Sequence, residues 1–134
     1  MPIVLVRSLA PPEPVRIQRM LSVVATDLAV ALNSDAADVW VYWQEVQAVV
    51  IGTRATAFAG HCPVATVLAR EGRDPDQISR SLRAVASAIA GSLGVPREDV
   101  WVHWLDIPSG RIYAGGGVGV SLLSKNHAGT ASRN

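Results

Sequence analysis

The sequence DVWVYW occupies Asp38–Trp43 and returns with one change as DVWVHW at Asp99–Trp104. The same shift of 61 residues superposes Pro2 on Pro63, and no gap is needed from Pro2 to Trp43. It also aligns one stripe of apolar residues with another: Ile17, Leu21, Val24, Leu28 and Leu32 with Ile78, Leu82, Val85, Ile89 and Leu93. A match of this length and register indicates an internal duplication.

The first copy predicts a strand, a helix and a second strand. Ile3–Leu9 is a short apolar run rich in β-branched residues, which is typical of a buried strand. Apolar residues then recur every three or four positions across Val15–Leu32, the period of an amphipathic helix. Val39–Val46 predicts the closing strand.

The second copy repeats this order, with a strand over Val64–Ala69, a helix ending near Leu93 and a strand over Val100–Leu105. Asp74 is a good helix N-cap, and Gln77 stands where a capping box requires it. Gly94 is expected to end the helix.

These elements predict an α/β fold in which two β-α-β units form a four-stranded sheet with pseudo-twofold symmetry. Each right-handed crossover makes its two strands parallel, and both helices cover one face. The other face is then bare, so we expect it to be covered by other subunits, in a ring. Residues 1–123 form the expected single domain, with repeats over 2–60 and 63–123 and a loose tail over 124–134. The glycine-rich stretch Ala114–Val120 is expected to be a strand or hairpin that reaches a neighbour.

Composition narrows the class of protein. The chain has 134 residues, 49% hydrophobic content, a net charge of +1 and a single cysteine, Cys62. We therefore expect a cytoplasmic protein with no nucleic-acid or membrane partner. No cofactor or metal is expected, because the sequence has neither a His/Cys/Asp/Glu cluster with metal-ligand spacing nor a phosphate-binding loop.

Pro2 is the candidate catalytic residue. An initiator methionine is normally removed before a small residue, and Pro2 would then present a secondary amine. An α-amino group has a pKa of about 7.7–8.0, and burial among apolar residues lowers that pKa. A neutral amine is a general base or a nucleophile at neutral pH. Pro63 cannot take this role, because its nitrogen is a chain amide; a Met-Pro start without function is the alternative.

Two arginines distinguish the second copy from the first. Arg70-Glu71-Gly72-Arg73 stands where the first copy has Leu9-Ala10-Pro11-Pro12. Two guanidinium groups at the end of a strand can bind a carboxylate in bidentate fashion. The alternative is a solvated turn with incidental charges.

The chain resembles the tautomerase superfamily, because it starts with Met-Pro and continues with two predicted β-α-β units. The second copy is similar to 4-oxalocrotonate tautomerase at Pro63, Glu71-Gly72-Arg73, Asp76-Gln77, Pro96, Val100 and Gly110. The fused length, Arg70-Glu71-Gly72-Arg73, Trp101-Val102 and Ile107-Pro108 resemble cis-3-chloroacrylic acid dehalogenase.

The resemblance implies that Pro2 is the catalytic base or acid and that Arg70 and Arg73 bind a substrate carboxylate. His103 stands where the dehalogenase has a positioning tyrosine, so it is a candidate substrate-binding residue or else a strand histidine. Trp40 and Trp101 replace an arginine of the tautomerase and form either an apolar wall of the site or core packing.

The dehalogenase also has a glutamate that activates water and a helical histidine. The positions that match them are Ala114 and about Ala29, so hydrolytic dehalogenation lacks its water-activating groups.

The resulting hypothesis is a cofactor-independent tautomerase for a 2-oxo acid, working as a homotrimer. Two alternatives stay open. One is a decarboxylase or a hydratase/dehalogenase acting on a three-carbon acid; the other is a catalytically silent oligomeric binding protein on the same fold.

Overall fold

The computed structural model describes residues 2–9, 13–52, 54–55, 61–114 and 117–118. In chain order its elements are β1 (Ile3–Leu9), α1 (Pro14–Leu32), the 3₁₀ turn η1 (Ala36–Asp38), β2 (Trp40–Val46), β3 (Val50–Ile51), β4 (Arg54–Ala55), β5 (Val64–Arg70), α2 (Pro75–Leu93), the 3₁₀ turn η3 (Arg97–Asp99), β6 (Trp101–Ile107), β7 (Tyr113–Ala114) and β8 (Gly117–Val118). Each strand and helix predicted by the two repeats is present.

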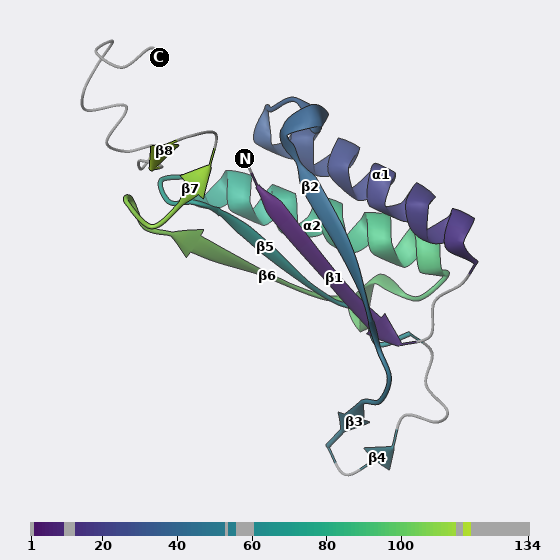
Figure 1. Cartoon of the computed structure of the whole chain (residues 1–134). Coiled ribbons are helices and arrows are strands. Elements are labelled where there is room, and N and C mark those ends of the chain that lie inside the picture. The colour runs from purple at the N-terminus through teal and green to yellow at the C-terminus, as the bar shows by residue number, and fades with distance from the viewer. Residues whose placement is uncertain (1, 10–12, 53, 56–60, 115–116, 119–134) are drawn as a thin grey trace.

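The main sheet has the strand order β2-β1-β5-β6. β1 pairs with β2 in parallel, and β5 pairs with β6 in parallel. The two units meet where β1 pairs with β5 antiparallel, with Ile3 opposite Leu68 and Arg7 opposite Val64. Both helices cover the same face of this sheet (Figure 1). The predicted α/β fold of two β-α-β units is therefore confirmed.

The two units repeat each other in detail. Both central helices have 19 residues, and all four long strands have seven. The Trp40 N–H donates to the Pro2 carbonyl over 3.1 Å, and the Trp101 N–H donates to the Pro63 carbonyl over the same distance. This bond fixes the start of each closing strand beside the start of each opening strand.

The ends of α2 show one prediction confirmed and one wrong. Gly94 ends the helix with φ of 70°, in the left-handed region that glycine adopts without a Cβ penalty. Asp74 stands at the N-cap, but its side chain makes no cap hydrogen bond, so the predicted capping box does not form. Asp74 is exposed, so water can solvate its carboxylate, while Gln77 lies at a groove between the helices.

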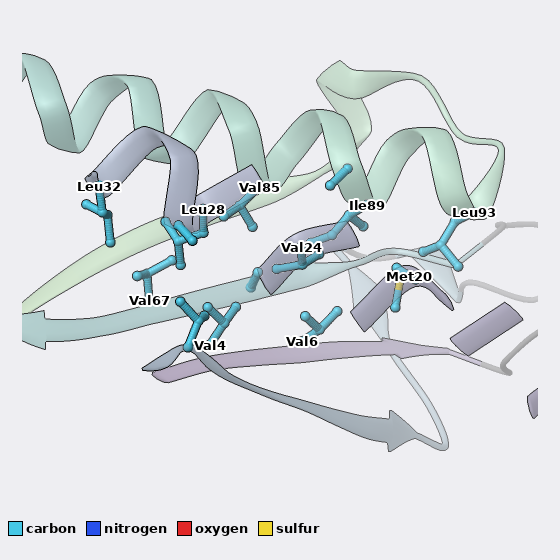
Figure 2. Packing of buried hydrophobic residues seen from close by; sticks show 14 residues of the cluster. Val4, Val6, Met20, Val24, Leu28, Leu32, Val67, Val85, Ile89 and Leu93 are labelled. Atoms are coloured by element: carbon cyan, nitrogen blue, oxygen red, sulfur yellow. The ribbon is translucent and has the colours of Figure 1, made fainter. Parts of the chain in front are cut away.

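The core lies between the sheet and the helices. In Figure 2, Val4 and Val6 of β1 and Val67 of β5 point toward the helices. They meet Met20, Val24, Leu28 and Leu32 of α1 and Val85, Ile89 and Leu93 of α2, all buried. Burying such side chains contributes about 1.5–3 kcal/mol each, so the predicted helical stripes supply the core.

The other face of the sheet carries none of the helices that the structure describes. We call it the open face: the side of β2, β1, β5 and β6 that alternates with the core positions. Four large side chains on its edge strands are exposed: Trp40 (48%), Tyr42 (48%), Trp101 (66%) and Leu105 (47%). The predicted bare face is thus present in the single chain.

Two small hairpins extend from the ends of the sheet. The pair β3–β4 follows β2 at the end opposite the N-terminus, and β7–β8 follows β6 (Figure 1). The second hairpin agrees with the predicted strand or hairpin over Ala114–Val120, of which 115–116 and 119–120 lie outside the described residues, as does the predicted tail. The hairpin β3–β4 was not predicted from the sequence. Within the described part of the chain, no helix is both long and apolar enough to cross a bilayer.

Replacing Leu28 with alanine should lower the free energy of unfolding by about 2–5 kcal/mol, because Leu28 is fully buried between both layers. Val30→Ala is the matched control on the same helix, since Val30 is 76% exposed. It should change stability by less than about 0.5 kcal/mol. Urea unfolding at one fixed protein concentration measures both. Equal losses would contradict the assigned core.

Candidate functional site

Pro2 lies at the start of β1 and is buried. Its carbonyl accepts the bond from the Trp40 N–H on one side. On the other side, continuing the antiparallel register of Ile3 opposite Leu68 brings Pro2 opposite Ala69. Pro2 is therefore next to Arg70, the last residue of β5. We call this end of the sheet, where β1 starts and β5 ends, the Pro2 end.

Arg70 is available to bind an anion. Residues alternate between the faces of a strand, and Ala69 is buried on the helix side, so Arg70 belongs to the open face. Among the described residues, it makes no hydrogen bond or ion pair. The nearby Glu71 carboxylate instead accepts the Ser109 N–H over 3.0 Å.

Arg73 has different neighbours from Arg70. One of its terminal nitrogens donates to the carbonyl of Leu32, the last residue of α1, over 3.3 Å. α1 has no basic residue in its last turn, so Arg73 supplies a cation at the negative end of that helix. Its Nε is buried and has no hydrogen-bond partner among the described residues, and burial lowers the pKa of the guanidinium. The structure thus gives Arg73 a helix-end contact, and joint binding of one carboxylate by both arginines stays a prediction.

His103 belongs to a row of hydrogen bonds that crosses all four long strands on the open face. Arg7 Nε donates to Gln44 Oε1 over 2.9 Å, and an Arg7 terminal nitrogen reaches Thr66 Oγ1 over 3.4 Å. Thr66 Oγ1 lies 3.0 Å from His103 Nε2, and Trp101 Nε1 donates to His103 Nδ1 over 3.2 Å. The row satisfies polar groups on a face that is otherwise largely apolar.

This row fixes the tautomer of His103. The indole N–H can only donate, so Nδ1 must present a lone pair to Trp101. The proton of a neutral ring then lies on Nε2, where it donates to Thr66 Oγ1. His103 therefore contacts Thr66 through Nε2 and Trp101 through Nδ1, and its role in substrate binding stays a prediction.

The two candidate wall tryptophans lie far apart. Trp40 pairs with Ile3 on the edge strand β2, whereas Trp101 pairs with Val64 on the opposite edge strand β6. The strand spacings put the two residues roughly 20 Å apart. Within one chain, Trp40 lies at the Pro2 end, and Trp101 lies at the opposite end, where Pro63 precedes β5. We call this opposite end of the sheet the Pro63 end.

Known structures share this arrangement. Native fused 4-OT covers 87% of this chain and 94% of its own, with a TM-score of 0.80 at 21% identity. N1, a member of the cis-3-chloroacrylic acid dehalogenase family, covers 89% of this chain and 84% of its own, with a TM-score of 0.74 at 21% identity. Macrophage migration inhibitory factor of Toxoplasma gondii covers 87% and 98%, with a TM-score of 0.72 at 15% identity. No family model matches the sequence, and no curated protein matches it significantly.

The chain has the tautomerase-superfamily fold. On this fold the two alanines that depart from the dehalogenase pattern occupy unlike places. Ala29 is 3% exposed and packs in the core on α1, and its methyl group cannot activate water. Ala114 lies in β7 beyond the end of β6, and its methyl group cannot activate water.

Sequence reasoning missed Arg7, Gln44 and Thr66. The signal was present for Arg7, because it is the only charged residue in the apolar strand Ile3–Leu9. Strand alternation assigns it to the same face as Leu5, away from the core. Gln44 and Thr66 could be found only from the pairing of β1 with β2 and β5, since neither residue type is unusual in a strand.

The neutral His103 ring should carry its proton on Nε2, because the Trp101 indole N–H donates to Nδ1. Long-range ¹H–¹⁵N spectra of the imidazole rings measure the tautomer, with His103→Asn identifying the signal. Trp101→Phe removes the donor and should raise the population with the proton on Nδ1. A dominant Nδ1–H form in the unmodified protein would contradict the row.

Proposed function

We propose that the chain is a tautomerase-superfamily member and a cofactor-independent tautomerase that interconverts the enol and keto forms of a 2-oxo acid at the Pro2 end. The observation that carries the proposal is the position of Pro2. It is buried at the start of β1 on a tautomerase-superfamily fold, next to an arginine without a partner in the described structure.

The chemistry requires one base and one cation. Removal of Met1 leaves Pro2 as a secondary amine, and its apolar surroundings favour the neutral form. The nitrogen takes the proton of the enol hydroxyl, the electron pair moves to form the carbonyl, and carbon 3 takes up a proton from the resulting ammonium. Arg70 binds the carboxylate and stabilises the negative charge that develops on the enolate. Arg73 would join it after exchanging its contact with Leu32 for one to the substrate.

The surroundings of Pro2 favour proton transfer over hydrolysis. Trp40 begins the strand beside Pro2 and offers a flat apolar surface for a planar substrate. Neither Ala29 nor Ala114 can activate water, so these positions do not support hydrolytic dehalogenation.

We further propose that the working form is a homotrimer in the cytoplasm, with the open face turned toward other subunits. Two of the similar structures, fused 4-OTs, are described as wild-type trimers, one asymmetric and one symmetric. Tyr42 and Leu105, both exposed on the open face, provide an apolar surface for association.

Pro2→Ala should lower kcat/KM for ketonisation of phenylenolpyruvate or 2-hydroxymuconate by about 10²-fold, since a positioned general base contributes 10²–10⁴-fold. Arg70→Gln should act mainly by raising KM, because it removes a carboxylate contact. Absorbance of the enol follows both reactions. Pro14→Ala is the matched proline control, because Pro14 begins α1 on the surface, and it should leave the rate unchanged.

The intact mass of the purified protein provides a second check. Loss of Met1 is required for the amine to exist. A protein that retains Met1, or a Pro2→Ala variant as active as the unmodified enzyme, would overturn the proposal and leave the catalytically silent binding protein as the better reading.

Leu105→Lys should dissociate the trimer, because a lysine on the open face would be buried between subunits without a partner. Val30→Lys is the control, since Val30 is exposed on α1, away from the open face. Sedimentation velocity reports the mass of each variant, and both should keep their circular dichroism spectra. A Leu105→Lys trimer as stable as the Val30→Lys trimer would show that subunits associate through another surface.

A further inference from the structure

A hollow of about 820 Å³ opens at the Pro63 end. Its lining includes Arg7 and Val46 from the first unit and Cys62, Pro63, Val64 and Trp101 from the second. The size falls within the range of small-molecule sites, about 300–1,000 Å³. Neither Pro2, Arg70 nor Arg73 is among the lining residues, so this hollow is separate from the proposed catalytic end.

Arg7 gives the hollow its charge. Its guanidinium makes one short bond to Gln44 and one longer contact with Thr66, both neutral acceptors. In the described part of the chain, no carboxylate pairs with it. A guanidinium has five N–H donors in a planar fork, so donors remain for a ligand. A carboxylate is the group that this fork recognises best.

The other residues that line the hollow favour a ligand with a planar, apolar body. Val46 and Val64 are aliphatic, and Trp101 is 66% exposed, so its ring is available for stacking. The bond from Trp101 to His103 holds the indole in place, and His103 in turn contacts Thr66, which also contacts Arg7. The cation and the aromatic wall are therefore held in one hydrogen-bonded row before any ligand arrives.

Pro63 cannot act as a base at this end of the sheet. It occupies the same place in its unit as Pro2 does in the other, at the start of an inner strand with its carbonyl bonded to a tryptophan N–H. Its nitrogen, however, is an amide within the chain and carries no basic lone pair. The hollow can bind a carboxylic acid but has no amine to move its protons.

We propose that the Pro63 end is a second, non-catalytic site that binds a planar, apolar monocarboxylate. Arg7 pairs with the carboxylate, Trp101 stacks on the flat body, and the aliphatic residues of β2 and β5 enclose it. The proposal uses none of the catalytic groups assigned to the Pro2 end, so either assignment can fail without the other.

One acidic residue limits the choice of ligand. Asp99 lines the hollow and is exposed, at the end of η3 beside Trp101. Its charge repels a second carboxylate on the ligand, which favours a monocarboxylate over a dicarboxylate. Asp99→Asn should accordingly tighten binding of a monocarboxylate by a few fold, an effect that is weakened by solvent screening.

Cys62 offers a direct test, because it is the only cysteine in the chain and lines the hollow. The probe is cinnamate, a planar monocarboxylate, and the measurement is the rate at which neutral iodoacetamide alkylates Cys62 in the full, assembled protein. Saturating cinnamate should slow alkylation by about tenfold, and its neutral isostere cinnamamide should not, since a charge-assisted bond to Arg7 provides the affinity.

The variants separate this site from the catalytic one. Arg7→Gln should abolish protection by cinnamate, whereas Arg70→Gln and Pro2→Ala should keep it. Asp99→Asn leaves the row intact and serves if Arg7→Gln does not fold: it should lower, by a few fold, the cinnamate concentration that gives half of the full protection. Equal protection by cinnamamide, no protection by cinnamate, or unchanged protection in the folded Arg7→Gln or Asp99→Asn variants would overturn the proposal. So would a Cys62 that is unreactive until the protein unfolds, because another subunit would then fill the hollow.

Discussion

The antiparallel pairing of β1 with β5 is the constraint on which the rest of the structure depends. Each β-α-β unit alone has two parallel strands and one helix, too little to bury a core. Joining the inner strands side by side makes a four-stranded sheet on which both helices pack (Figure 1). Because the pairing is antiparallel, it also turns one unit end for end relative to the other. The two equivalent prolines therefore lie at opposite ends of the sheet, and each meets an arginine from the other unit: Pro2 beside Arg70, and Pro63 beside Arg7.

That geometry explains why duplication permits asymmetry. In two identical units the two ends would be equivalent, and any cation present at one would be present at the other. Here the repeat partner of Arg70 is Leu9, and the repeat partner of Arg7 is Leu68. The arginines at the two ends therefore stand at positions that are not equivalent in the repeat, and their side chains have different surroundings. The end with a potential amine has a cation free of partners in the described structure, and the end without one has a cation already held by two neutral acceptors.

The sequence predicted the elements well because periodicity and duplication reinforce each other: β1 and the end of α2 fall where the pattern put them. It predicted the pseudo-twofold symmetry but not the register in which β1 pairs with β5, because a repeat in sequence says nothing about which residues of the two copies lie opposite each other. For this reason the sequence did not show that Trp40 and Trp101 lie at opposite ends of the sheet within one chain. The contact of Arg73 with Leu32 was equally hidden, since it joins residues of different units through the helix layer. The β3–β4 hairpin lacks both the length and the periodicity that a pattern search requires.

The two faces of the sheet have diverged to different degrees, and the difference separates packing from chemistry. On the helix face the buried or half-buried repeat pairs are small or apolar except for Ser8: Val4/Ala65, Val6/Val67, Ser8/Ala69, Val41/Val102 and Trp43/Trp104. The charged pair Glu45/Asp106 lies near the strand ends, where both residues are exposed. On the open face Ile3/Val64, Trp40/Trp101 and Val46/Ile107 stay apolar, whereas other pairs differ in polarity: Leu5/Thr66, Arg7/Leu68, Leu9/Arg70, Tyr42/His103 and Gln44/Leu105. A buried helix–sheet interface penalises any polar group without a partner, so its residues stay alike. The open face is not covered by a helix of the described chain, so polar side chains there can stay hydrated or pair with one another. Arg7, Thr66 and His103 have Leu68, Leu5 and Tyr42 as their repeat partners. Within the chain Arg7 contacts Thr66 and Thr66 contacts His103, so the polar residues that distinguish the two copies on this face satisfy one another's hydrogen bonds.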